Sequence, residues 1–107
     1  MMLILNNYIE QITKICELNN VKSLFAFGSI TTDRFNSNSD IDLLVDIYDI
    51  DPLTYTDKYY NLKFQLEDLL KRQIDLLEER ALKNRTLKSE IDRTKVLIYG
   101  SADKKMA

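Results

Sequence analysis

Residues 24–46 constrain this chain most, because two apolar runs there flank a polar segment. The first run ends at Gly28-Ser29, and the second begins beside Asp40 and Asp42. On a β-strand, side chains two residues apart point to the same face. The pattern therefore predicts that the two acids share one face of a strand, while the apolar residues between and after them anchor the other face in a core.

The same stretch carries the groups that phosphate chemistry requires. Two neighbouring carboxylates are hard oxygen ligands of the kind that Mg²⁺ takes, together with phosphate oxygens and water. A Gly-Ser turn can present backbone N–H groups to a phosphate at the start of a helix. This combination indicates phosphoryl or nucleotidyl transfer, with Asp40 and Asp42 as metal ligands and catalytic groups. The alternative is that both acids are surface residues where a strand begins.

Gly28-Ser29, ten further residues and then Asp40-Ile41-Asp42 together resemble the signature of the nucleotidyltransferase superfamily that includes DNA polymerase beta. The short chain is similar to one branch of it, the minimal nucleotidyltransferases, many of which are antitoxins paired with a HEPN-domain ribonuclease toxin. The resemblance implies an α/β (α+β) fold with a small mixed sheet covered by helices. It also implies an active site open at one end and no substrate-binding domain.

A third carboxylate is expected from a later strand, because the superfamily typically uses one there. Asp75 is the good candidate, since it lies on a predicted strand with apolar neighbours on the opposite face. It would be a catalytic residue and a metal ligand on the side of the attacking hydroxyl. The alternative is a solvated acid at a strand end, in which case the chain would bind a nucleotide without turning it over.

Four residues are predicted to bind the nucleotide: Gly28, Ser29, Arg34 and Ser39. The serine hydroxyl and backbone N–H at position 29 would donate to the β- and γ-phosphates, with Gly28 permitting close approach. Arg34 could reach the triphosphate, although a solvated arginine is the simpler alternative. Ser39 could touch phosphate or brace its loop. Many family members carry a glycine where this chain has Asp33, a difference that we interpret as a subfamily mark.

The resemblance implies Mg²⁺-dependent transfer of AMP from ATP to a protein hydroxyl, with two Mg²⁺ ions as cofactors. It further implies that the partner is a HEPN toxin modified on a tyrosine. After the sheet is built, too few residues remain to grip a small-molecule or RNA acceptor, so a partner must supply the nucleophile. Two alternatives stay open. One is an inactive nucleotide-binding or toxin-masking module, and the other is the core of a small-molecule-modifying transferase completed by another chain.

The composition of the chain argues against several other classes of function. A chain of 107 residues supports a single domain spanning residues 1–107. The net charge of −2 disfavours binding to long nucleic acid, and the lack of histidine excludes a histidine base or histidine-ligated zinc. Cys16 is the single cysteine, which agrees with a reducing cytoplasm. Since no apolar run approaches bilayer length, we expect a cytoplasmic protein without membrane contact.

Hydrophobic periodicity supplies the expected elements. Helices are predicted at residues 3–18, 29–33, 52–71 and 86–95, and strands at residues 21–27, 40–47, 73–77 and 96–99. Asp51 should cap the long helix, with Pro52 in its first turn. Cys16 should be a buried packing thiol, Tyr8, Tyr55 and Tyr59 should be core or interface residues, and Lys71 and Arg72 should be charged residues at a helix end. Residues 101–107 are expected to fray.

Overall fold

A mixed sheet of four strands, in the order β3-β2-β1-β4, is the frame of the structure, a computed structural model that describes residues 2–48 and 51–100. Strand β1 (Val21–Phe27) pairs antiparallel with both β2 (Ile41–Ile47) and β4 (Val96–Gly100). Strand β2 pairs parallel with β3 (Ile74–Glu78). The expected mixed sheet is therefore confirmed, and with it the α+β class.

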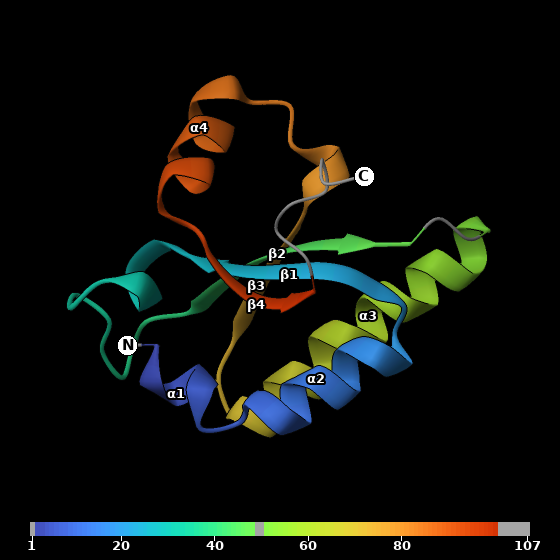
Figure 1. Cartoon of the computed structure of the whole chain (residues 1–107), viewed down its shortest axis with the longest axis horizontal. Helices are drawn as coiled ribbons and strands as arrows, with labels where there is room; N and C mark the ends of the chain where they lie inside the picture. The colour runs from blue at the N-terminus through green and yellow to red at the C-terminus, as the bar shows by residue number, and fades with distance from the viewer. Residues whose placement is uncertain (1, 49–50, 101–107) are drawn as a thin grey trace.

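Helices cover the two faces of the sheet unequally, as Figure 1 shows. Helices α1 (Leu3–Asn6), α2 (Ile9–Leu18) and α3 (Pro52–Leu70) lie on one face, and α4 (Arg85–Thr94) lies on the other. Two 3₁₀ turns, η1 (Gly28–Thr31) and η2 (Glu79–Ala81), follow β1 and β3. Within the described residues, no helix combines the length and the apolar character that crossing a bilayer requires.

The main core fills the space between the sheet and the first three helices. It contains Leu5, Ile12, Cys16, Val21, Leu24, Ala26, Ile30, Ile41, Leu43, Val45, Ile47, Leu62, Leu66, Leu70, Ile74 and Leu76. A second, smaller cluster on the other face joins Phe25 and Leu44 to Ile91, which is the buried side chain of α4. The face under α4 is thus packed more lightly, and this is the face to which the even-numbered residues of β2 point.

Strand β2 confirms the alternation predicted from sequence. Ile41, Leu43, Val45 and Ile47 are buried in the main core, whereas Asp42 and Asp46 are half-buried on the opposite face. A strand with one apolar and one polar face fixes its register strongly, since a slip of one residue would exchange the faces. The aspartate side chains are therefore held on the α4 side by the burial of their neighbours.

The long helix begins as predicted. The Asp51 side chain accepts a hydrogen bond from the Thr54 backbone N–H at 3.2 Å, and Pro52 occupies the first turn, where its missing N–H costs nothing. The helix ends one residue before the predicted end, because Lys71 has φ = 56° and is the left-handed C-cap.

Three expectations need correction. The predicted helix at 3–18 is divided into α1 and α2, because Tyr8 leaves helical geometry at φ = −117° and ψ = 20°. Asn6 and Asn7 precede the break, and asparagine competes for backbone hydrogen bonds in helices. Tyr8 is also 36% exposed, so it is not a core residue, and its place at an interface stays a prediction. The helix predicted at 29–33 is only the 3₁₀ turn η1, and the residues predicted to fray lie outside the described residues.

Other sequence expectations are confirmed. Cys16 is fully buried in the main core, and burial raises the pKa of its thiol to about 12. Tyr55 and Tyr59 are half-buried against the same core. The Tyr55 hydroxyl donates to Glu78 at 2.6 Å, and that of Tyr59 donates to the Leu76 carbonyl oxygen at 2.6 Å. These tyrosines therefore fasten α3 to β3.

Candidate active site

The turn after β1 lies directly against Asp42. Gly28 has φ = +77°, and a Cβ atom placed on it would lie 2.5 Å from Oδ2 of Asp42. The preceding residue, Phe27, is paired with Asp42 in the antiparallel ladder of β1 and β2. Glycine is required here both by its backbone conformation and by the close approach of the carboxylate. The turn and the acidic face of β2 are thus one structural unit.

Asp75 lies beside Asp42 because the two are paired across the parallel ladder of β2 and β3. The pKa of Asp42 is raised to about 6, first by burial, then by the negative charges of Asp75 and Asp40, and finally by a side-chain hydrogen bond with Asp75. Two carboxyl groups in contact on a partly buried surface oppose each other's ionisation. A bound cation would relieve that opposition.

Asp40 stands at the rim of this pair. It is exposed, immediately before β2, and its charge acts on Asp42 two residues later. Across residues 2–48 and 51–100, no three Asp, Glu, Cys or His side chains are gathered closely enough to form a complete metal-binding group. Mg²⁺, however, is commonly held by one or two carboxylates, with substrate phosphates and water completing its coordination. The donor set of Asp42 and Asp75 fits a Mg²⁺ ion of that kind.

A hollow of about 310 Å³ opens beside the Gly28-Ser29 turn. Its lining residues come from the turn, from the loop after it and from α4: Gly28, Ser29, Thr31, Thr32, Arg34, Glu90 and Thr94. The turn is closed by hydroxyl groups, since Thr31 Oγ1 donates to the Gly28 carbonyl oxygen at 2.7 Å and Thr32 Oγ1 to that of Ser29 at 2.9 Å. Three of the four predicted nucleotide-binding residues therefore border one space.

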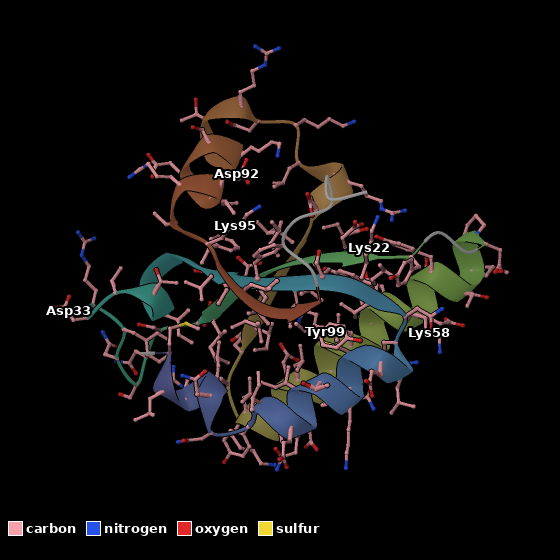
Figure 2. The ribbon with its side chains drawn as sticks, viewed as in Figure 1. Lys22, Asp33, Lys58, Asp92, Lys95 and Tyr99 are labelled. Atoms are coloured by element: carbon pink, nitrogen blue, oxygen red, sulfur yellow. The ribbon has the colours of Figure 1, made fainter. Side chains whose placement is uncertain are left out.

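Ser39, the fourth, has contacts within its own loop. Its Oγ accepts a hydrogen bond from the Asn36 backbone N–H at 3.1 Å, and its carbonyl oxygen accepts one from Arg72 at 2.6 Å. The Arg72 guanidinium also lies 4.4 Å from the centre of the Phe35 ring. Ser39 and Arg72 together brace the loop that leads into Asp40. Asp33 lies at the outer tip of the segment after η1 and is exposed (Figure 2).

Sequence reasoning overlooked the bracing role of Arg72. Its position near the end of a helix suggested an ordinary charged residue at a helix end. Its hydrogen-bond partners, however, lie more than thirty residues earlier in the chain, and the Ser39 carbonyl oxygen is 33 residues away. Contacts at such separations leave no local pattern. The role of Arg72 follows only from the packing of the α3 end against this loop.

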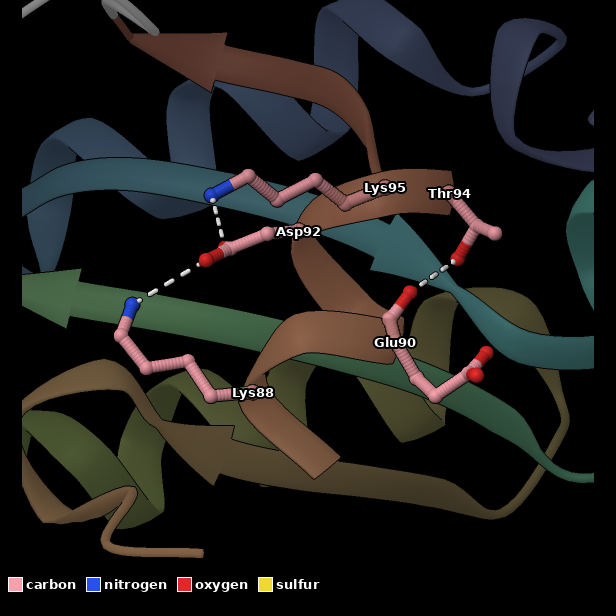
Figure 3. A network of polar contacts seen from close by, with 5 residues as sticks. All are labelled: Lys88, Glu90, Asp92, Thr94 and Lys95. Carbon is pink, nitrogen blue, oxygen red and sulfur yellow. Dashed lines mark hydrogen bonds and ion pairs between the residues drawn. The ribbon is translucent and has the colours of Figure 1, made fainter. Parts of the chain in front are cut away.

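The contribution of α4 was also missed, because a polar helix reads as a solvated surface. Along its outer side, Asp92 accepts hydrogen bonds from Lys88 at 3.2 Å and from Lys95, the C-cap residue, at 2.9 Å (Figure 3). The Lys95 ammonium lies 4.4 Å from the centre of the Phe25 ring. Figure 3 shows the Glu90 side chain extending from the other side of the helix than this network, and Glu90 lines the hollow beside the Gly28-Ser29 turn.

Comparisons with known proteins identify the family of the chain. Residues 10–104 match the family model described as polymerase beta, nucleotidyltransferase. A protein of Methanocaldococcus jannaschii, named as an inferred protein adenylyltransferase, is 37% identical over 79 residues, which are 74% of this chain and 76% of that protein. The solved structure of an inferred minimal nucleotidyltransferase is 27% identical, with a TM-score of 0.72, over 86% of this chain and 90% of that one.

A structure of a tri-AMPylated HEPN toxin of Shewanella oneidensis in complex with its MNT antitoxin shares the fold. The match has a TM-score of 0.65 at 19% identity and covers 95% of this chain and 77% of that chain. Since the family model spans nearly the whole sequence and a relative above 30% identity covers most of it, the chain belongs to the polymerase beta nucleotidyltransferase family.

Proposed function

We propose that this protein transfers AMP from ATP to a hydroxyl group of a partner protein. The observation that carries the proposal is the contact of Asp42 with Asp75 beside the Gly28-Ser29 turn. Family membership supports nucleotidyl transfer as the reaction class. The name of the M. jannaschii relative supports a protein acceptor.

The same fold in an antitoxin bound to a tri-AMPylated HEPN toxin supports a HEPN toxin as the partner. A tyrosine of that toxin is the acceptor that we propose. The modification would neutralise the toxin, which makes this protein an antitoxin acting by covalent chemistry.

In the proposed reaction, the acceptor oxygen attacks the α-phosphorus of ATP. A new bond forms between that oxygen and the α-phosphorus, while the bond from the α-phosphorus to the α–β bridging oxygen breaks and pyrophosphate leaves with the electron pair. Asp75, which is exposed at the edge of the sheet, accepts the hydroxyl proton. The Ser29 hydroxyl and backbone N–H donate to the departing phosphates, and Arg34 offsets their charge.

Asp42 and Asp75, with Asp40 at the rim, would hold two Mg²⁺ ions, which supply charge neutralisation of the triphosphate and a lowered pKa of the attacking hydroxyl. Positioning and charge stabilisation account for the catalysis, and no covalent intermediate with the protein is needed.

Mass spectrometry of a purified HEPN-domain partner, incubated with this protein, ATP and Mg²⁺, tests the proposal. The partner should gain the mass of one or more AMP groups, and the gain should disappear with Asp42→Asn and with Asp75→Asn. Asp46→Asn is the matched control, because Asp46 lies on the same face of the same strand but is paired with Arg80 at 3.1 Å. That variant should still transfer AMP.

Two outcomes would overturn the proposal. Inhibition of the partner at equal stoichiometry without any mass gain would indicate a masking module. Equal losses in the Asp42→Asn and Asp46→Asn variants would indicate a general structural effect of removing charge from β2.

A further inference from the structure

A second hollow continues the first one along α4. It measures about 140 Å³ and is lined by Phe27, Gly28, Leu87, Glu90, Ile91 and Thr94. The two hollows share Gly28, Glu90 and Thr94. The two hollows therefore adjoin each other between the Gly28-Ser29 turn and α4, and together we call them the α4 groove.

The chemistry of the α4 groove changes from one end to the other. One end carries the hydroxyl groups of the turn and the guanidinium of Arg34. The opposite end is apolar, with Phe27, the 41% exposed Leu87 and the buried Ile91. Glu90 and Thr94 belong to both hollows and so mark its middle. A nucleoside triphosphate has the same order of groups: charged phosphates, a hydroxylated sugar and a flat apolar base.

Glu90 has the right chemistry for the sugar position. An ionised carboxylate only accepts hydrogen bonds, so it can take both vicinal ribose hydroxyls but repels phosphate. Its side chain is 63% exposed and forms an ion pair with Arg93, one helical turn later. That pairing leaves it on the groove side of α4, opposite the Lys88–Asp92–Lys95 network (Figure 3).

The packing of α4 against the sheet explains how a polar helix can hold a fixed position beside the groove. Ile91 enters the small cluster with Phe25 and Leu44, and Lys95 lies over the Phe25 ring. These contacts fix the helix through residues other than Leu87 and Glu90. Substitutions at those two exposed positions should therefore change the groove without unfolding the chain.

We propose that α4 forms the nucleoside-binding wall of the active site, an inference that rests on the proposed function. Leu87 and Phe27 cover the base, and Glu90 accepts hydrogen bonds from the 2′- and 3′-hydroxyls of the ribose. Ser29 and Arg34 hold the phosphates at the other end. The wall makes the site selective for ribonucleotides.

Equilibrium binding to the full chain, in the presence of Mg²⁺, tests the wall with three probes: ATP, 2′,3′-dideoxy-ATP and inorganic tripolyphosphate. Glu90→Ala should weaken ATP about 3- to 10-fold, as expected for lost hydrogen bonds, and leave dideoxy-ATP unchanged. Leu87→Ser should weaken both nucleotides about fivefold through lost apolar contact. Neither variant should weaken tripolyphosphate binding, which also reports that the site is folded.

Arg93→Ala is the matched control for Glu90→Ala, because it removes the same ion pair without changing a groove residue. It should bind all three probes as the unaltered chain does. If it reproduces the Glu90→Ala loss, the ion pair and not the ribose contact is responsible, and the inference fails.

The inference and the proposed function fail in different ways. The proposed function is wrong if the unaltered chain does not bind ATP. It is also wrong if the Asp42→Asn variant binds Mg²⁺ and ATP as tightly as the unaltered chain does. If binding depends on Asp42 but Leu87→Ser and Glu90→Ala match the unaltered chain, only the nucleoside wall is wrong.

Discussion

The two glycines of this chain allow an unusually direct test of how the site is built. Both have positive φ, but a Cβ atom would meet different neighbours at each. At Gly28 it would lie 2.5 Å from Oδ2 of Asp42, the end of a side chain that can rotate away. Gly28→Ala should therefore lose about 1–2 kcal/mol of folding free energy, chiefly from the left-handed backbone.

The same substitution should remove most of the transfer activity. The Asp42 carboxylate must move to admit the methyl group, and it then leaves its contact with Asp75. A displacement of about 1 Å in a catalytic group can reduce the rate on the order of 100-fold. We expect a loss of at least that size for AMP transfer per folded molecule.

At Gly100 the neighbour is backbone. A Cβ atom would lie 2.1 Å from the Lys22 carbonyl oxygen and 3.0 Å from Ser23 Cα, so β4 would have to separate from β1. Gly100→Ala should cost about 2–5 kcal/mol, the sum of overpacking and left-handed strain. Ser23 is four residues, or about 13 Å, from the catalytic end of β1, so the folded fraction should keep its activity.

Urea denaturation and a transfer assay normalised to the folded fraction separate the two effects. The expected result is a crossed pattern, in which Gly28→Ala is folded but inactive and Gly100→Ala is less stable but active. An active Gly28→Ala protein would refute the reasoning about Asp42. A Gly100→Ala protein that is the more stable of the two would refute the geometric argument itself.

Three further predictions concern single sites. Asp42→Asn should stabilise the metal-free protein at pH 7.5 by about 1 kcal/mol, a value reduced because the carboxyl is partly exposed. The folded pKa of about 6 exceeds the ordinary 3.8, so the charged carboxyl lowers the stability of the unaltered protein as pH rises through that interval. Urea titrations in EDTA should show the gain vanish near pH 4, and an unchanged unfolding midpoint at pH 7.5 would contradict the prediction. Cys16 should react with iodoacetamide at pH 8 roughly 1000-fold more slowly in the native than in the unfolded chain, because its pKa of about 12 leaves little reactive thiolate. Comparable rates in the two states would show that the thiol is not buried. Arg72→Ala should accelerate hydrogen exchange of the Ser39 amide, which donates to the Asn36 carbonyl oxygen at 3.1 Å, and unchanged exchange would mean that Arg72 does not brace the loop.

Sequence patterns sufficed where local physics decides the outcome. The alternation along β2 placed Asp42 on the polar face, and the Asp51-Pro52 pair located the start of α3. Sequence patterns could not predict the helix break at Tyr8, because the helical spacing of apolar residues continues through it. The groove residue Glu90 was equally hidden, since its importance comes from the packing of α4 against a turn some sixty residues earlier in the chain.

The pairing of Asp42 with Asp75 shows most clearly where local pattern ends. Alternation alone puts each acid on a polar face, but their contact depends on the parallel register of β2 with β3. A shift of one residue would turn Asp75 toward the core. The register is fixed at the start of β3, where the Ile74 N–H donates to Glu67 of α3 at 3.1 Å and the Gln73 carbonyl oxygen accepts from Ile41 at 3.1 Å. The chemistry of the site therefore depends on the helix that joins the two strands as much as on the acids themselves.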